Sequence, residues 1–212
     1  MPFDYKKEYK EYYMPKNKPE IMSIPKMNFI AVYGKGNPNE EVGEYKTAIS
    51  ILYDIAYSIK MSKKGDYIIE GYFDYVVPPL EGLWWQENLD CIDYSRKDDF
   101  CWISLIRLPD FVTKNDFFKI KKEAEYKKKQ DYSKVEFMNI EEGLCVQCMH
   151  IGSYDEEDKT VSMMDRFIEE QGYIYDFDFS QKRLHHEIYL SDTRRVVPEK
   201  QKTVIRHPIR KR

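Results

Sequence analysis

A strand-helix-strand-strand order occurs twice along this chain, and this repeat limits the possible folds more than any other feature of the sequence. In the first half, β-forming residues predict a strand at 27–33, and apolar residues at three- and four-residue steps predict a helix at 40–60. Two further strands are predicted at 67–77 and 100–108, and the segment 78–85 between them is interpreted as part of a loop.

The second half follows the same order. Strands are predicted at 143–151, 184–191 and 203–209, with an amphipathic helix at 156–171 after the first of them. A basic segment at 113–129 has the composition of a helix that connects the two halves. The halves share a pattern and little residue identity, so the repeat predicts two similar modules related by a pseudo-twofold axis.

The repeat predicts an α+β fold. It comprises two strand-helix-strand-strand modules with pseudo-twofold symmetry, antiparallel sheets, helices on one face and a ligand groove between the modules. A chain of 212 residues suits a single domain of this kind. The predicted boundaries are an N-terminal lead segment at 1–24 and one domain at 25–212, with module one at about 25–110, a connector helix at about 113–130 and module two at about 136–209.

The overall charge excludes a dedicated nucleic-acid binder. Lysine and arginine number 34 against 37 aspartate and glutamate, a formal net charge of −3, whereas phosphate contacts need a clear basic excess. No window approaches the roughly 20 apolar residues of a membrane-spanning helix. The first residues lack the apolar run of a signal peptide, so a cytoplasmic location is expected, with no membrane partner.

Two cysteines have the spacing of a metal or redox motif. Cys145 and Cys148 form C-x-x-C, and His150 follows. The surrounding residues predict a strand, in which side chains three positions apart point to opposite faces and do not converge on one metal ion. Glycine-rich phosphate loops are also missing from the sequence. We therefore expect no metal, nucleotide or organic cofactor.

An acidic residue in the strand at 184–191 is the main candidate for function. Residue parity places His185, Glu187 and Tyr189 on one face, and His186 with its apolar neighbours on the other. The apolar face suits packing under a helix, so Glu187 is expected to point away from the helix layer. It is either an ordinary solvated carboxylate on an open sheet face or an acid inside the predicted groove.

Aromatic residues are the second candidate feature. The chain has 18 tyrosines, 11 phenylalanines and 3 tryptophans, and phenol or indole faces suit a wall that binds flat or cationic molecules. Trp84 and Trp85 follow two prolines in the predicted loop. One of these indoles can line a pocket, or the loop can simply cover a sheet edge.

Three stretches resemble GyrI-like small-molecule-binding proteins: 187–200, 79–85 and 150–154. The resemblance spans about 25–209 and implies the same pair of modules about a pseudo-twofold axis. Members of that family include drug-binding domains of multidrug-responsive regulators, a gyrase-inhibitory protein, and stand-alone proteins that hydrolyse cyclopropane-containing genotoxins. Ser153 stands where many relatives have proline, a difference confined to a turn.

The resemblance implies a role for Glu187 as the acidic residue at the floor of the pocket, and for the tryptophan-bearing segment as part of its aromatic wall. We predict Glu187 and Tyr189 as catalytic residues. The predicted ligand-binding residues are Trp84, Trp85, Tyr72, Tyr75, Tyr33, His150 and Tyr154.

Two functions fit such a pocket. One is a cyclopropanoid hydrolase that binds planar hydrophobic substrates and uses Glu187, with a pKa raised by its aromatic surroundings, to activate water. The other is a non-catalytic protein that binds or sequesters lipophilic cationic drugs, or that serves as the effector partner of a regulator. No helix-turn-helix segment is recognisable, so direct nucleic-acid binding is not expected. The sequence leaves a protein partner open.

Overall fold

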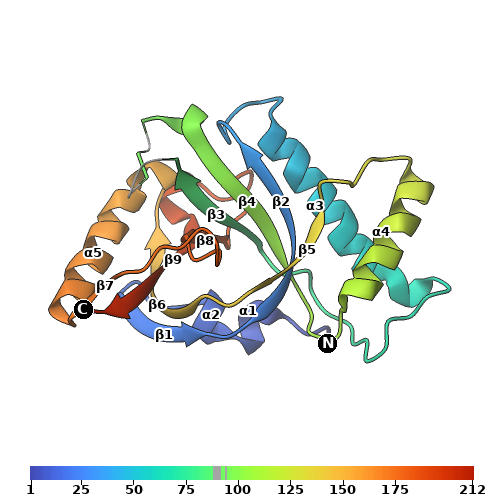
Figure 1. Cartoon of the computed structure of the whole chain (residues 1–212), viewed down its shortest axis with the longest axis horizontal. Helices are drawn as coiled ribbons and strands as arrows, with labels where there is room; N and C mark the ends of the chain where they lie inside the picture. The colour runs from blue at the N-terminus through green and yellow to red at the C-terminus, as the bar shows by residue number, and fades with distance from the viewer. Residues whose placement is uncertain (88–91, 94) are drawn as a thin grey trace.

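The computed structural model describes residues 1–87, 92–93 and 95–212 and contains one large, mainly antiparallel sheet (Figure 1). The strands are β1 (Glu20–Ile24), β2 (Met27–Lys35), β3 (Leu80–Gln86), β4 (Phe100–Leu108), β5 (Glu136–Ile140), β6 (Gly143–Ile151), β7 (Tyr173–Tyr175), β8 (His185–Tyr189) and β9 (Lys202–Lys211). The helices are α1 (Tyr5–Glu8), α2 (Lys10–Tyr13), α3 (Glu44–Met61), α4 (Lys114–Lys128) and α5 (Glu157–Glu170).

The strand order confirms the predicted pair of modules. The sheet runs β1-β6-β9-β8-β3-β4-β2-β5, with β7 paired to β9. The units β2-α3-β3-β4 and β6-α5-β8-β9 therefore occupy equivalent positions on the two sides of the β3–β8 pair. We call this pair the seam, because there the modules join edge to edge into one sheet.

Both long module helices cover the same face of the sheet, here called the helix face. His185 on β8 pairs with Trp84, which packs among the buried residues of α3, and Glu187 pairs with Ile205, which packs with α5. Paired residues in antiparallel strands point to the same side. Glu187 therefore lies on the helix face, between α3 and α5, and the prediction that it points away from the helix layer is wrong.

The N-terminal segment covers the opposite face. Tyr5 and Tyr13, from α1 and α2, pack with Ile188 and Val204 of the central strands, and Figure 1 shows both short helices below the sheet. β1 then adds a strand beside β6. The lead segment is thus ordered and contributes to the sheet and to one of its two cores.

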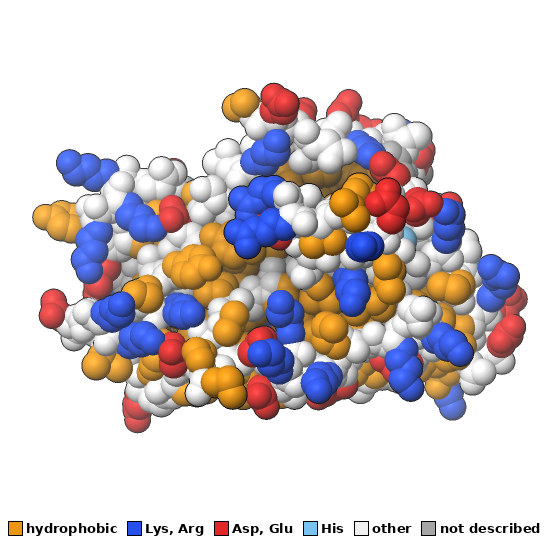
Figure 2. Space-filling model, turned by 180° about the vertical axis from the view of Figure 1, so that it is seen from behind, with side chains coloured by type: hydrophobic (Ala, Val, Ile, Leu, Met, Phe, Trp, Pro, Cys, Tyr) orange, Lys and Arg blue, Asp and Glu red, His pale blue; other side chains and the backbone are white. Residues whose placement is uncertain are grey.

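The remaining helix, α4, lies between β4 and β5 in the chain. Thr113 caps it: the Thr113 hydroxyl accepts from the Asp116 amide, and the Asp116 carboxylate accepts from the Thr113 amide. Its buried residues Phe117 and Ile120 join the core of α3. No helix in the described ranges is both long and apolar enough to cross a membrane. On the face in Figure 2, lysine and arginine side chains are scattered among apolar and acidic ones.

Two predictions between α3 and β4 are wrong. The segment 67–77 is not a strand: Gly71 has a positive φ of 73°, and within this segment Tyr75 alone makes a bridge, to Phe3. The predicted loop at 78–85 contains most of β3, because Pro78 and Pro79 precede the strand and do not interrupt it. Cys145 and Cys148 do lie in a strand and pack into different cores, as expected.

Candidate functional site

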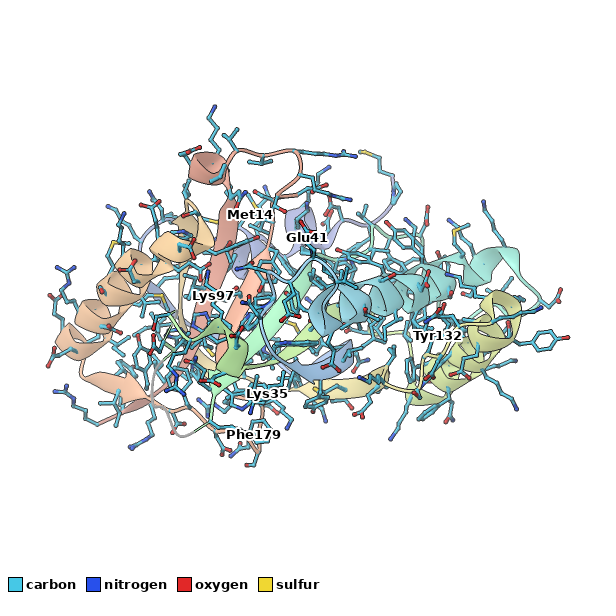
Figure 3. All side chains as sticks on the ribbon, turned by 90° about the horizontal axis from the view of Figure 1, so that it is seen from above. Met14, Lys35, Glu41, Lys97, Tyr132 and Phe179 are labelled. Carbon is cyan, nitrogen blue, oxygen red and sulfur yellow. The ribbon has the colours of Figure 1, made fainter. Side chains whose placement is uncertain are left out.

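A cavity of about 840 Å³ opens on the helix face above the seam. Figure 3 shows α3 and α5 on either side of the central strands, and the lining residue Lys97 lies between the two helices in this view. The aromatic side chains that line the cavity are Tyr45, Tyr53, Tyr57, Trp84, Phe100, Tyr154 and Tyr189. Its charged lining consists of Lys46, Lys97, Asp155, Glu157, Glu187, Asp192 and Arg194.

Glu187 lies at the floor of this cavity and is 7% exposed. One carboxylate oxygen, Oε1, accepts a hydrogen bond from His185 Nε2 at 2.9 Å, and the other, Oε2, accepts from the Tyr189 hydroxyl at 2.7 Å. Burial by itself raises the pKa of Glu187, but the interactions of the carboxylate with His185, Tyr189 and Glu157 together outweigh burial and bring the pKa below its usual value. Glu187 is therefore ionised, contrary to the raised pKa expected from its aromatic surroundings.

Tyr189 is held from two sides. Its hydroxyl donates to Glu187 and accepts from Trp84 Nε1 at 2.9 Å. Gly82, which pairs with Glu187 across the seam, leaves room for this contact, because a Cβ there would lie 2.6 Å from Trp84 Nε1 and 2.9 Å from the Tyr189 oxygen. A second phenol, Tyr154, packs edge-on against Tyr189. The floor is thus a fixed set of hydrogen-bonded and packed side chains.

A second carboxyl group faces Glu187 and was not predicted as a site residue. Glu157, the first residue of α5, is 1% exposed, and neither of its oxygens has a hydrogen-bond partner within the described ranges. Burial, and then the negative charge of Glu187, raise the pKa of Glu157 well above its usual value. The two opposite shifts place the proton of this pair on Glu157 and the negative charge on Glu187.

The two carboxyl groups and His185 form one cluster. One oxygen from each acid and a ring nitrogen of His185 lie within 4.8 Å of one another, a spacing at which three ligand atoms could reach one small cation. In the structure, the His185 ring donates to Glu187 and the proton of Glu157 reduces the charge between the acids. We treat the cluster as an acid–base pair with a supporting histidine, since opposite pKa shifts on neighbouring carboxyl groups are typical of such pairs.

The structure brings together four of the predicted site residues, Trp84, Tyr154, Glu187 and Tyr189, on the wall and floor of the cavity. Trp85 and Tyr33 point to the opposite face of the sheet, because neighbouring strand residues alternate. The Trp85 ring packs on Phe179 with centroids 4.9 Å apart, and Lys182 Nζ lies 5.4 Å from the Tyr33 ring centre. Neither residue lines the cavity.

Tyr72, Tyr75 and His150 also lie outside the cavity lining. Tyr72 and Tyr75 pack around Phe111, because their segment lies beside the N-terminal residues, where Tyr75 pairs with Phe3, and is not a strand of the sheet. His150 is a buried residue of β6 that lies beside the first turns of α5. Its Nε2 donates to the Ser153 carbonyl, and its Nδ1 accepts from the Thr160 hydroxyl, both at 2.9 Å. Its contacts are structural.

Sequence analysis missed Glu157 and the tyrosines of α3. Glu157 belongs to the acidic run 155–158, which is usual in a first helical turn, and nothing local distinguishes the buried member from its exposed neighbours. Tyr45, Tyr53 and Tyr57 recur at helical spacing along α3, a periodic signal that could have indicated an aromatic wall.

Comparison with known proteins identifies the family of this chain. The model of the GyrI-like small molecule binding domain matches residues 17–210. The chain belongs to the GyrI-like family. This GyrI-like chain is 45% identical to a hydrolase from Listeria innocua, with a TM-score of 0.87, covering 98% of this chain and 100% of the other.

A second Listeria innocua structure, of an uncharacterized conserved protein, is 47% identical, with a TM-score of 0.90 and coverage of 98% and 100%. The EcmrR C-terminal domain shares the fold at 12% identity, with a TM-score of 0.55 and coverage of 92% and 98%. No curated protein matches the chain. The protein is thus a small-molecule-binding GyrI-like domain whose similar structures include one named as a hydrolase.

Proposed function

We propose that this GyrI-like protein is a hydrolase that adds water to planar, hydrophobic molecules carrying a strained electrophilic ring, such as cyclopropane-containing genotoxins. One observation carries the proposal: two buried carboxyl groups, Glu157 and Glu187, share a cavity and have pKa values shifted in opposite directions. Such a pair supplies one acid and one base at the same pH. The hydrolase name of the 45% identical Listeria innocua protein agrees with this chemistry.

Glu187 is the proposed base. Its carboxylate removes a proton from a water molecule as the water oxygen bonds to a carbon of the strained ring. A ring C–C bond breaks, and its electron pair moves into a conjugated carbonyl group, which becomes an enolate or phenolate oxygen. The hydrogen bonds from His185 and Tyr189 hold the carboxylate in place during this step.

Glu157 is the proposed acid. It gives its proton to the oxygen on which negative charge develops, so that one molecule of water is added in total. The proton on Glu187 then passes to Glu157, which has an oxygen within 4.8 Å, through one bridging water molecule. This transfer restores both groups.

The aromatic lining gives the cavity its proposed substrate class. A volume of about 840 Å³ lies within the range of drug-sized sites, roughly 300–1,000 Å³. Trp84 and Tyr45, with ring centres 5.4 Å apart, provide flat faces beside the acid–base pair. Planar ring systems stack on such surfaces, and stacking positions the reacting carbon near Glu187.

The Glu187→Gln variant tests the proposal. With a cyclopropane-bearing polyaromatic substrate followed by absorbance, we expect kcat to fall about 10³-fold, because the amide cannot accept the proton. Binding of the ring-opened product is expected to persist. Glu136→Gln on strand β5, an exposed position, is the matched control and keeps wild-type turnover. Unchanged turnover in Glu187→Gln refutes the role of Glu187 as base.

The ionised state of Glu187 also favours a second candidate, the binding of lipophilic cations without chemistry. A carboxylate surrounded by tyrosine and tryptophan faces attracts a cation by charge and by cation–π contacts of about 0.5–2 kcal/mol each. In that case, Glu187→Gln weakens binding of tetraphenylphosphonium and not of a neutral compound of similar shape. Loss of cation binding, together with the absence of any substrate turnover by the wild-type protein, favours this function over hydrolysis.

A further inference from the structure

Two buried histidines are linked to Glu187 by consecutive hydrogen bonds. On β8, His185 donates from Nε2 to Glu187, and its other ring nitrogen, Nδ1, lies 2.6 Å from Nε2 of His207 on β9. Both rings are buried. Tyr175 and Phe177 pack edge-on against His207 with ring centres 5.0 and 5.3 Å away. The hydrogen bonds therefore form a chain from His207 through His185 to Glu187.

The surroundings of His207 Nδ1, at the end of this series of hydrogen bonds, determine where the protons of the two histidines lie. His207 Nδ1 is buried and has no hydrogen-bond partner among the residues that the structure describes. A proton on that nitrogen would be an unpaired buried N–H, which proteins avoid more strictly than an unpaired acceptor. His207 therefore carries its proton on Nε2, and burial lowers the pKa of His207 well below its usual value, which keeps the ring neutral.

The remaining protons follow from this one. His207 Nε2–H donates to His185 Nδ1, which must then be an unprotonated acceptor, and His185 carries its own proton on Nε2. That proton points at Glu187 Oε1. The opposite arrangement, or a doubly protonated His185, would force the proton of His207 onto the unpartnered Nδ1.

We propose that His207 is a positioning residue that fixes His185 in its Nε2–H tautomer, so that His185 always donates to Glu187 and keeps this carboxylate ready to accept a proton. The link to turnover rests on the proposed hydrolase function, whereas the tautomers themselves do not. Glu187 is otherwise faced by Tyr189 of its own strand, Glu157 of α5, Tyr154 of the turn before α5 and Tyr45 of α3, none of which is a cation. Within the described site, the proton of His185 is thus a main support for the charge of Glu187.

Nitrogen-15 NMR of the full labelled chain tests the tautomers directly. At pH 7 we expect His185 and His207 both to show the shifts of neutral rings protonated at Nε2, with assignments from His185→Gln and His207→Gln. A His207 ring protonated at Nδ1, or a cationic His185, overturns the inference. This measurement needs no substrate, so its outcome is separate from that of the hydrolase proposal.

Two variants of His207 test the consequence for the site. In His207→Gln, the amide nitrogen can take the place of Nε2 and donate to His185, whereas His207→Leu fills the space without a donor. Each variant is first checked by thermal unfolding. We expect His207→Leu to lower kcat about tenfold at pH 6 and to move the acidic limb of the kcat profile to higher pH, and His207→Gln to stay within about threefold of wild type.

His150→Gln, a buried histidine outside the cavity, is the matched control and leaves the profile unmoved. If both His207 variants lose activity equally and the pH profile does not shift, His207 acts through packing alone and the proposal is wrong.

Discussion

The two adjacent histidines of β8 point to opposite faces of the sheet and belong to different kinds of buried network. His186, on the opposite face, bonds Glu142 through Nδ1 and Glu81 through Nε2, each at 2.9 Å. Arg206 donates to the other oxygen of Glu142 at 2.8 Å. Burial lowers the pKa of His186, but the two carboxylates outweigh it and raise the pKa to about 9. His186 and Arg206 thus balance the two acids, and Arg107 is a third buried cation near Glu81.

On the helix face the balance is different. Two acids, Glu157 and Glu187, are buried there side by side, and the opposite shifts of their pKa values put the proton of the pair on Glu157. Burial is nearly the same on both faces, so burial alone does not separate structure from function. The difference teaches that buried acids matched by buried cations make a network whose disruption is costly to the fold, whereas two carboxyl groups with opposite pKa shifts beside a cavity have the arrangement typical of acid–base sites.

The largest effect expected from this comparison is on stability. His186→Gln removes the charge between Glu81 and Glu142 and leaves buried carboxylates underpaired, so the free energy of unfolding should fall by about 3–5 kcal/mol. Urea denaturation measures the loss. The matched change His150→Gln disturbs two hydrogen bonds of a buried histidine and should cost about 1–2 kcal/mol.

The same network gives stability a defined pH dependence. Because the folded pKa of His186, about 9, lies above the usual 6.5, its contribution is complete below pH 6.5 and is lost as the pH rises through 9. Glu142, whose pKa is lowered to about 2, loses its contribution as the pH falls from 4.5 toward 2. A variant His186→Gln that keeps the wild-type decline between pH 6.5 and 9 would contradict this account.

The next largest expected effect is on turnover, when Glu157 is replaced. Glu157→Gln keeps a buried hydrogen-bond donor but has no proton to give, so kcat should fall about 100-fold while the protein remains folded. In wild type, turnover should decline at low pH as Glu187 is protonated and at high pH as Glu157 loses its proton. Glu157→Gln should keep the decline at low pH and lose the decline at high pH. If the variant shows both declines, Glu157 is not the acid of the mechanism.

The smallest expected effect is on ligand affinity, and it compares two neighbouring tryptophans that point to opposite faces of the sheet. Trp84→Phe loses the hydrogen bond to Tyr189 and part of the cavity wall, and should weaken binding of a planar ligand about tenfold, as measured by fluorescence titration. Trp85→Phe changes a ring that packs on Phe179 beneath the sheet and should leave affinity within about twofold. Equal losses would mean that the faces are coupled.

Much of this arrangement could be predicted from local patterns. Parity on β8 correctly grouped His185, Glu187 and Tyr189, because side-chain alternation is a property of the strand itself. Which face carried the helices could not be read from one strand. The apolar neighbours of His186 suggested a helix above them, but the N-terminal segment packs there, and α3 and α5 flank Glu187 on the other side.

Contacts that depend on packing between distant elements were not predictable. Glu157 meets Glu187 only because the first turn of α5, a helix that packs on β6, comes close to β8. Tyr75 pairs with Phe3 of the N-terminal segment, which no local pattern indicates. Trp85 was assigned to the cavity because the segment was interpreted as a loop; once it is a strand, only one of two consecutive indoles can reach each face.

Because the two modules meet at the seam within one polypeptide, the side chains on its two strands can differ. Had the two modules been separate identical chains, every side chain along this line would occur twice, and the cavity would hold duplicate sets of acid, imidazole and phenol. One continuous polypeptide removes that obligation. It can present a bare backbone at Gly82 on one strand and a carboxylate at Glu187 on its neighbour, and so a nearly symmetrical frame supports a one-sided set of cavity groups.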